Sequence, residues 1–216
     1  MNLRFEIVTS LEQFHHITAK WGNLIAVDTE TYGKAWDKPE NRRLLGISIA
    51  TLTNPNNTPN ALYIPFNSFQ DGLWHVHDTS WCYPMLEQWL ASKALIGHNF
   101  AYDELWLRLA GVNTSWHACT RLMYHMASAP SGAKRYSLKD AQKELLGWPE
   151  SNKDEMALHV KAMGGDIKKG DHYLATLSTL AKYACLDTMS TALVYSELTS
   201  FFNTYTYWDQ LHIVMQ

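Results

Sequence analysis

Short apolar runs bounded by turn-forming residues dominate the first part of the chain. Residues 24–31, 44–51 and 61–66 are rich in β-branched and aromatic side chains, and clusters of Gly, Pro and Asn separate them. Such runs are typical of strands, and their succession predicts an antiparallel meander. Residues 94–97 form a fourth run of this kind and lead directly into a helical pattern. A sheet built mainly from the first half of the chain is therefore expected.

Helical periodicity dominates the later part of the chain. Apolar residues recur at spacings of three and four within residues 80–92, 99–110, 119–127, 138–146 and 174–202. A Gly-Trp-Pro sequence at 147–149 and a Gly-Gly pair at 164–165 interrupt the pattern and mark helix ends. Strands followed by helices, with a strand-turn-helix unit between them, predict an α/β fold whose mixed sheet is flanked by helices.

Composition and charge restrict the class of protein. The chain has 216 residues, of which 46% are hydrophobic, so it can bury the core of one large domain. It has neither a continuous apolar stretch long enough for a membrane span nor an apolar N-terminal signal, so a cytoplasmic protein without membrane association is expected. The net charge of −3 argues against binding nucleic acid by bulk phosphate neutralisation. An anionic substrate would need metal ions or a few well-placed cations.

Two acidic residues interrupt the first apolar run. Asp28 and Glu30 follow Ile25, Ala26 and Val27 directly, and residues two apart in a strand point to the same side of the sheet. Two carboxylates this close repel each other and lose solvation unless a cation compensates them. A metal site is one interpretation, and an edge strand with solvated acids is the other.

Two further acidic residues lie on predicted helices, each four positions from a polar neighbour. Asn99 and Asp103 share one helical face, as do Tyr183 and Asp187. Each pair alone has an ordinary explanation. Asn99 can cap a helix, Asp103 can complement the helix dipole, and Tyr183 can be a core residue beside an exposed carboxylate.

Together these fragments place four carboxylates and one phenol on three separate elements. Hard divalent cations such as Mg²⁺ prefer oxygen ligands. A two-metal site, with ions about 3.5–4 Å apart, needs about this many acids to stabilise the attacking and leaving oxygens of phosphoryl transfer. The combination therefore indicates metal-assisted phosphodiester chemistry.

The three acidic motifs also resemble those of a known family. VDTET, HNFAYD and YACLD occur in the order and at the spacing of the three exonuclease motifs of the DEDD superfamily of 3′→5′ exonucleases. Tyr183, four residues before Asp187, resembles the Tyr-bearing branch, which includes the proofreading domains of DNA polymerases and ribonuclease D. LLGISIA, LYIPF and SLKDAQKELLG are further similar to the proofreading domain of family A DNA polymerases. The resemblance covers roughly residues 20–200 and implies a ribonuclease H-like exonuclease fold with a mixed five-stranded sheet, assigned to residues 1–203.

The resemblance also implies roles for the acidic residues and the phenol. Asp28, Glu30, Asp103 and Asp187 match the positions that hold two divalent metal ions, Mg²⁺ or Mn²⁺, and Tyr183 matches the residue that orients the attacking water. The implied reaction is hydrolysis of the terminal phosphodiester of DNA at the 3′ end of a single strand, which releases nucleoside 5′-monophosphates.

Substrate contacts follow from the same resemblance. The backbone of Thr29 and the side chains of Asn99 and Tyr102 match positions beside the 3′-terminal nucleotide. A basic residue before the SL of SLKDAQKELLG is implied to contact the scissile phosphate, and Arg135 is the candidate, with Lys134 as the alternative.

The chain departs from the family pattern in two places. The loop after Glu30 is long and carries Trp36, whose position there favours contact with nucleic acid. Residues 152–171, which include the pair Lys168-Lys169, are expected to be an insertion. Base-stacking contacts implied by the resemblance are therefore least defined near these two segments.

Two alternative functions and one question of domain organisation stay open. An exoribonuclease of the ribonuclease D kind would use the same motifs, and a non-enzymatic nucleic-acid-binding module could retain the fold. At the C-terminus, residues 204–216 contain an apolar helical face. This face favours a helix that leads into a polymerase domain, and packing against the exonuclease domain itself is the alternative.

Overall fold

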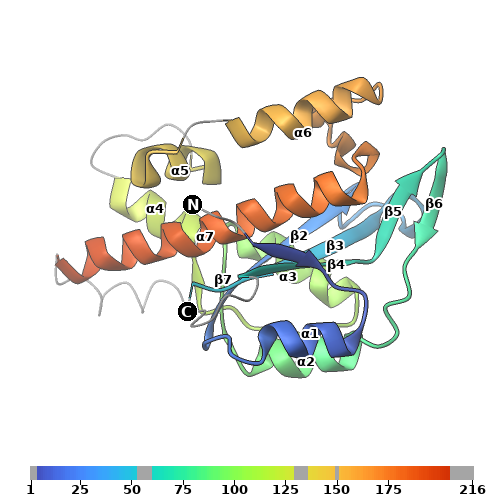
Figure 1. Cartoon of the computed structure of the whole chain (residues 1–216). Coiled ribbons are helices and arrows are strands. Elements are labelled where there is room, and N and C mark those ends of the chain that lie inside the picture. The colour runs from blue at the N-terminus through green and yellow to red at the C-terminus, as the bar shows by residue number, and fades with distance from the viewer. Residues whose placement is uncertain (1–3, 53–59, 129–135, 149–150, 205–216) are drawn as a thin grey trace.

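A six-stranded mixed sheet in the order β1-β4-β3-β2-β7-β8 forms the centre of the computed structural model (Figure 1). The structure describes residues 4–52, 60–128, 136–148 and 151–204. The strands of the sheet are β1 (Phe5–Ile7), β2 (Leu24–Tyr32), β3 (Arg43–Ala50), β4 (Ala61–Pro65), β7 (Ala94–Gly97) and β8 (Ala118–Cys119). A separate hairpin projects from one end of the sheet and consists of β5 (Asn67–Gln70) and β6 (Leu73–Val76).

The strand pairing confirms the meander and the mixed sheet but not the number of strands. β2 pairs with β3, and β3 with β4, in antiparallel register. β7 runs parallel to β2, β8 parallel to β7, and β1 parallel to β4. The sheet has six strands rather than the expected five. β1 and β8 span only three and two residues, so neither is long enough to show a strand periodicity in the sequence.

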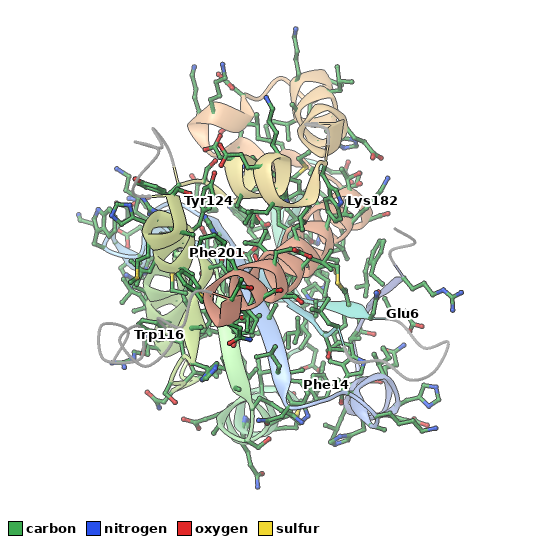
Figure 2. All side chains as sticks on the ribbon, turned by 90° about the vertical axis from the view of Figure 1, so that its left-hand side faces the viewer. Glu6, Phe14, Trp116, Tyr124, Lys182 and Phe201 are labelled. Carbon is green, nitrogen blue, oxygen red and sulfur yellow. The ribbon has the colours of Figure 1, made fainter. Side chains whose placement is uncertain are left out.

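Helices cover both faces of the sheet. One face carries α1 (Leu11–Thr18), α2 (Tyr83–Ala91) and α3 (Phe100–Leu109), and the other carries the long helix α7 (Leu177–Thr204). Packed around α7 are α4 (Thr120–Ser128), α5 (Leu138–Leu146) and α6 (Ser151–Ala162). Figure 2 shows the two layers from the end, with Phe14 of α1 and Tyr124 of α4 on opposite sides of the sheet.

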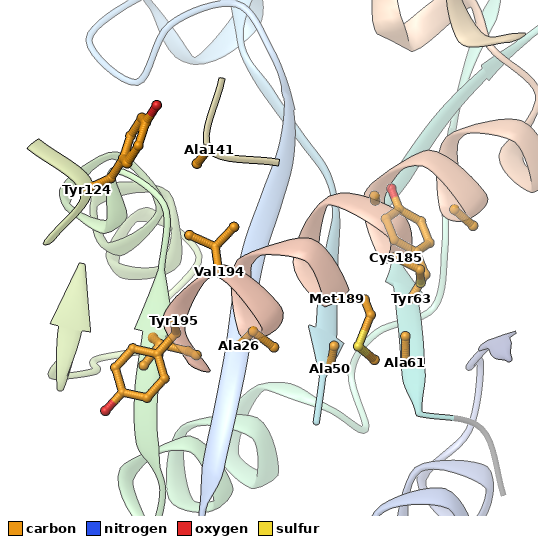
Figure 3. Close-up of a cluster of buried hydrophobic side chains, with 14 of the residues drawn as sticks. Ala26, Ala50, Ala61, Tyr63, Tyr124, Ala141, Cys185, Met189, Val194 and Tyr195 are labelled. Carbon is orange, nitrogen blue, oxygen red and sulfur yellow. The ribbon is translucent and has the colours of Figure 1, made fainter. Parts of the chain in front are cut away.

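Small side chains allow α7 to lie close to the sheet. Ala26, Ala50 and Ala61 are buried on the face toward α7, beside Met189 of the helix (Figure 3). Because side chains alternate along a strand, Ile25 and Val27 of β2 point to the other face and pack in the core beneath α1 and α2. The same alternation directs Asp28 and Glu30 toward α7, so the sequence pattern of β2 determines which helix faces its acids.

The structure describes the expected insertion at residues 152–171 but not the expected helix at 204–216. Residues 152–171, expected to be an insertion, contain most of α6 and the 3-10 turn η3 (Ile167–Lys169), and a second such turn, η4 (Asp171–Leu174), begins at their end. A third such turn, η1 (Pro39–Asn41), lies in the loop after β2. The helix expected at 204–216 falls outside the described residues apart from Thr204, which ends α7. No helix of the described segments is long and apolar enough to cross a membrane.

Candidate active site

β2 places two of the acidic residues in the interior of the sheet. The strand lies between β3 and β7, which excludes the interpretation of a solvated edge strand. Glu30 is buried, with 8% of its surface exposed, and Asp28 is partly exposed. In the register with β3, Asp28 lies opposite Ser48 and Glu30 lies opposite Gly46. Two acids in an inner strand are costly to bury, so a compensating positive charge is expected there.

α3 brings the third acid to the same strand. Asp103 is buried, and its Oδ1 accepts hydrogen bonds from the backbone N–H of Thr29 at 2.9 Å and from the Thr29 hydroxyl at 2.6 Å. The hydroxyl of Tyr102 lies 2.9 Å from Oγ1 of Thr31. Asp103 therefore ties the first turn of α3 to β2, and a surface carboxylate that only complements the helix dipole does not describe it.

Asn99 occupies the N-cap position of α3, but its side chain does not cap the helix. It precedes α3 in the left-handed conformation, with φ of 67°, and its side chain makes no capping hydrogen bond. Its Oδ1 instead accepts a hydrogen bond from Nη1 of Arg121 at 2.9 Å. Asn adopts the left-handed conformation more readily than most residues, and here it frees the side chain to bind Arg121.

A cavity of about 360 Å³ opens beside Asn99. Its lining combines the Arg121 guanidinium with the aromatic rings of Trp116, His125 and Tyr136. A cation next to flat aromatic surfaces suits a nucleotide, whose phosphate is negative and whose base can stack. Arg121 could not be predicted from the sequence, because a single Arg within a helical stretch belongs to no recognisable motif.

α7 carries the fourth acid and the phenol. Tyr183 and Asp187 are both partly buried, which corrects the interpretation of a core tyrosine beside an exposed carboxylate. Nζ of Lys139 on α5 forms an ion pair with Oδ1 of Asp187 and lies 5.2 Å from the centre of the Tyr183 ring. The ring of His172 on η4 stacks on the Tyr183 ring, and the two ring centres are 6.0 Å apart. Lys139 belongs to the SLKDAQKELLG motif, but only the fold reveals its contact with Asp187.

The four carboxyl groups share one electrostatic field. Burial, followed by the charges of Asp187 and Asp103, raises the pKa of Glu30 to about 8. Burial also raises the pKa of Asp103 to about 7, against the lowering effect of its hydrogen bonds from Thr29. The pKa of Asp28 is raised well above its usual range, first by burial and then by Asp103, Glu30 and Asp187. Ionising all four carboxyl groups together is therefore unfavourable without a compensating cation.

The donor set fits hard divalent cations, although the side chains are not arranged around an ion. Carboxylate oxygens in a buried, mutually repelling group are the ligands that Mg²⁺ and Mn²⁺ prefer. Within residues 4–52, 60–128, 136–148 and 151–204, no three His, Cys, Asp or Glu side chains stand close enough together to hold a metal ion. Thr29 and Lys139 engage two of the carboxylates. Cation binding would therefore compete with Lys139 for Asp187.

These pKa shifts predict how the metal-free protein responds to pH. Between the usual pKa of 4.5 and the folded value of about 8, folded Glu30 retains a proton that the unfolded chain has lost. Stability should therefore fall as pH rises through this range, because ionisation is more costly in the folded state. We expect a lower melting temperature at about pH 8.5 than at about pH 5 in EDTA, and recovery on adding Mg²⁺.

The variant Glu30→Gln provides the control for this pH dependence. It removes one titrating group from the cluster, so its melting temperature in EDTA should depend less on pH than that of the wild-type protein. A wild-type melting temperature that rises between the same two pH values would contradict the prediction.

The structure describes some of the residues predicted to contact the substrate and leaves others out. Arg135 and its alternative Lys134 lie outside the described residues. Trp36 is 72% exposed, and Nζ of Lys34 lies 5.8 Å from its ring centre. The other three predicted contact residues lie near Asp103 at the N-terminus of α3; they are Thr29, Asn99 and Tyr102.

Comparisons with known proteins identify the family and the fold. A family model described as 3′–5′ exonuclease matches residues 5–202. NrnC of Brucella melitensis with bound Mg²⁺ is 19% identical, with a TM-score of 0.59 over 99% of this chain and 88% of that chain. RNase D of Trypanosoma brucei in complex with RNA U12 is 12% identical, with a TM-score of 0.60 over 91% of this chain and 63% of that chain.

A polymerase is also similar in structure. Pol1 from M. smegmatis, in complex with DNA primer-template and dNTP, is 14% identical, with a TM-score of 0.59 over 93% of this chain and 28% of that chain. No curated protein matches the chain significantly. At these identities the structural likeness shows the fold, which is the ribonuclease H-like α/β fold expected from the sequence.

Proposed function

Because the chain belongs to the 3′–5′ exonuclease family, whose model it matches over residues 5–202, we propose that it removes nucleotides from the 3′ end of single-stranded DNA. The observation that carries the proposal is the shared electrostatic field of Asp28, Glu30, Asp103 and Asp187, beside the Tyr183 phenol. The products are nucleoside 5′-monophosphates, and the reaction requires divalent cations.

Each part of the site has a distinct role in the proposed reaction. The four carboxylates would hold two divalent cations, Mg²⁺ or Mn²⁺, which supply activation of water and neutralisation of the scissile phosphate. The hydroxyl of Tyr183 orients the attacking water by a hydrogen bond. Lys139 holds Asp187 and balances part of the negative charge.

The substrate strand is proposed to bind along α3 and α4. Thr29 and Tyr102 lie beside Asp103 and are placed to contact the terminal nucleotide. Asn99 and Arg121 form one hydrogen-bonded unit at the rim of the aromatic cavity and would hold the phosphate and base that precede it. Arg135, or Lys134, is proposed to contact the scissile phosphate.

Removing Arg121 should weaken substrate binding more than catalysis. We expect Arg121→Ala to raise KM for a single-stranded substrate about tenfold, as for the loss of one charge-assisted hydrogen bond, with a smaller change in kcat. Steady-state kinetics on a labelled oligonucleotide would measure both. Arg108→Ala is the matched control, because Arg108 is exposed and pairs only with Glu104 on the same helix in the described structure. Equal KM values for the two variants would contradict this role.

DNA is the preferred substrate in this proposal, and RNA is the alternative. The matching family model is named for DNA polymerase A, and the Pol1 structure contains DNA. The RNase D structure contains RNA, which supports an exoribonuclease. The discriminating experiment compares mononucleotide release, in Mg²⁺, from DNA and RNA of the same sequence. Blocking either end of each substrate identifies the direction, and binding without release from either would favour a non-enzymatic module.

A proofreading role gives a further test of the DNA proposal. If the 3′ end is delivered by a polymerase domain, the site must receive an unpaired strand. A mismatched, frayed primer end should then be shortened faster than a fully paired one. Equal rates on the two ends would contradict proofreading without contradicting exonuclease activity.

A further inference from the structure

A buried tyrosine outside the acidic motifs lies next to Glu30. Tyr63, on β4, has none of its surface exposed, and its hydroxyl is one of a few buried polar atoms that lack a hydrogen-bond partner among the described residues. Burying an unpaired hydroxyl costs folding free energy, so native proteins seldom retain one without a reason. The phenol therefore needs an explanation.

The strand register shows where this hydroxyl points. Tyr63 lies opposite Ser48 on β3, and Ser48 lies opposite Asp28 on β2, so the three residues form one row across the sheet. Two positions further along, in the next row on the same face of the sheet, Gly46 lies opposite Glu30. A Cβ placed on Gly46 would be 2.2 Å from the hydroxyl oxygen of Tyr63. The Tyr63 ring is therefore tilted away from Ser48 toward Gly46, and it fills the space that a side chain at position 46 would occupy.

This orientation of Tyr63 brings its hydroxyl toward Glu30. Residues directly opposite in an antiparallel pair have neighbouring side chains on the same face, so the space above Gly46 adjoins the Glu30 side chain. Figure 3 shows Tyr63 against α7, beside Cys185. The charges of Glu30 and Asp28 add to burial in raising the pKa of Tyr63, so the phenol stays protonated and can only donate to a carboxylate.

We propose that Tyr63 is a positioning residue, whose hydroxyl donates a hydrogen bond to the side chain of Glu30 and orients it in the cation site. The inference rests on the proposed function, since it assigns Glu30 to the cation site. Gly46 is part of the same arrangement, because any side chain there would displace the phenol.

The test uses Tyr63→Phe in the full chain, which keeps the ring and removes only the hydroxyl. Hydrogen-bond partners of metal ligands typically contribute 10- to 100-fold to metal affinity, so Mg²⁺ binding measured by calorimetry should weaken by about this factor. The melting temperature in EDTA should stay the same or rise, because an unpaired buried hydroxyl is removed. The melting-temperature gain produced by Mg²⁺ should shrink.

Tyr124→Phe is the matched control. Tyr124 is also buried, but its hydroxyl donates to Glu144, away from β2. This variant should lower the melting temperature in EDTA and leave Mg²⁺ affinity unchanged. Combining Tyr63→Phe with Glu30→Gln should give no further loss of Mg²⁺ affinity beyond that of Glu30→Gln, if the two groups act together.

Two results would overturn the inference alone. One is wild-type Mg²⁺ affinity in Tyr63→Phe, and the other is a lower melting temperature in EDTA with an unchanged Mg²⁺ response, as for a purely structural tyrosine. A wild-type protein that neither binds Mg²⁺ nor releases nucleotides would overturn the proposed function together with it.

Discussion

Replacing Asp28 or Asp187 with asparagine is expected to reduce nucleotide release about 10³-fold or more. Such a loss corresponds to about 4 kcal/mol of transition-state stabilisation, which is reasonable for removing a ligand shared by the catalytic cations. Asn keeps the size of the side chain and removes the charge. Single-turnover rates in saturating Mg²⁺ at neutral pH would measure the effect directly.

The substitution at Asp28 should not damage the fold. Asp28 is crowded by Asp103, Glu30 and Asp187, so removing its charge relieves repulsion in the metal-free protein. The melting temperature of Asp28→Asn in EDTA should therefore equal or exceed that of the wild-type protein. Asp71→Asn is the control, since Asp71 is exposed between β5 and β6. Near-normal turnover in Asp28→Asn or Asp187→Asn would rule out the assignment of the site.

Tyr183→Phe is expected to lower kcat about 100-fold with little change in KM. The substitution retains the ring with its contacts to Lys139 and His172 and removes only the hydroxyl that is proposed to orient water. A positioned group of this kind contributes about 10²- to 10⁴-fold, so the lower end of that range is expected for orientation alone. Steady-state kinetics with a single-stranded substrate would separate the two parameters.

Tyr195→Phe serves as the control for this substitution. Tyr195 lies on the same helix, more than two turns after Asp187, and its hydroxyl is 3.4 Å from Nε2 of His117. Its removal should leave kcat unchanged. A result in which Tyr183→Phe raises KM and leaves kcat intact would assign Tyr183 to substrate contact instead of chemistry.

The sequence alone predicted the elements that have local patterns. The runs at 94–97 and 138–146 coincide with β7 and α5, and the meander of β2, β3 and β4 follows from apolar runs separated by turns. Asp28 and Glu30 share a side of β2 because alternation along a strand is a local property. Short or non-periodic elements escaped prediction for the same reason. β1 and β8 are too short to show alternation, and α6 lies in a stretch whose apolar residues do not follow one face.

The tertiary structure decided which residues surround the acids. Lys139 contacts Asp187 across 48 positions of sequence, and Arg121 reaches Asn99 across 22. Tyr63 reaches the space beside Glu30 only because two strand registers align Gly46 with it. Contacts of this kind depend on how strands pair and helices pack, and no periodicity of the chain encodes them. The sequence by itself therefore determined the acids, the phenol, and the one strand and two helices that carry them. Packing determined which basic side chains and hydroxyl groups lie beside the acids and adjust their charge.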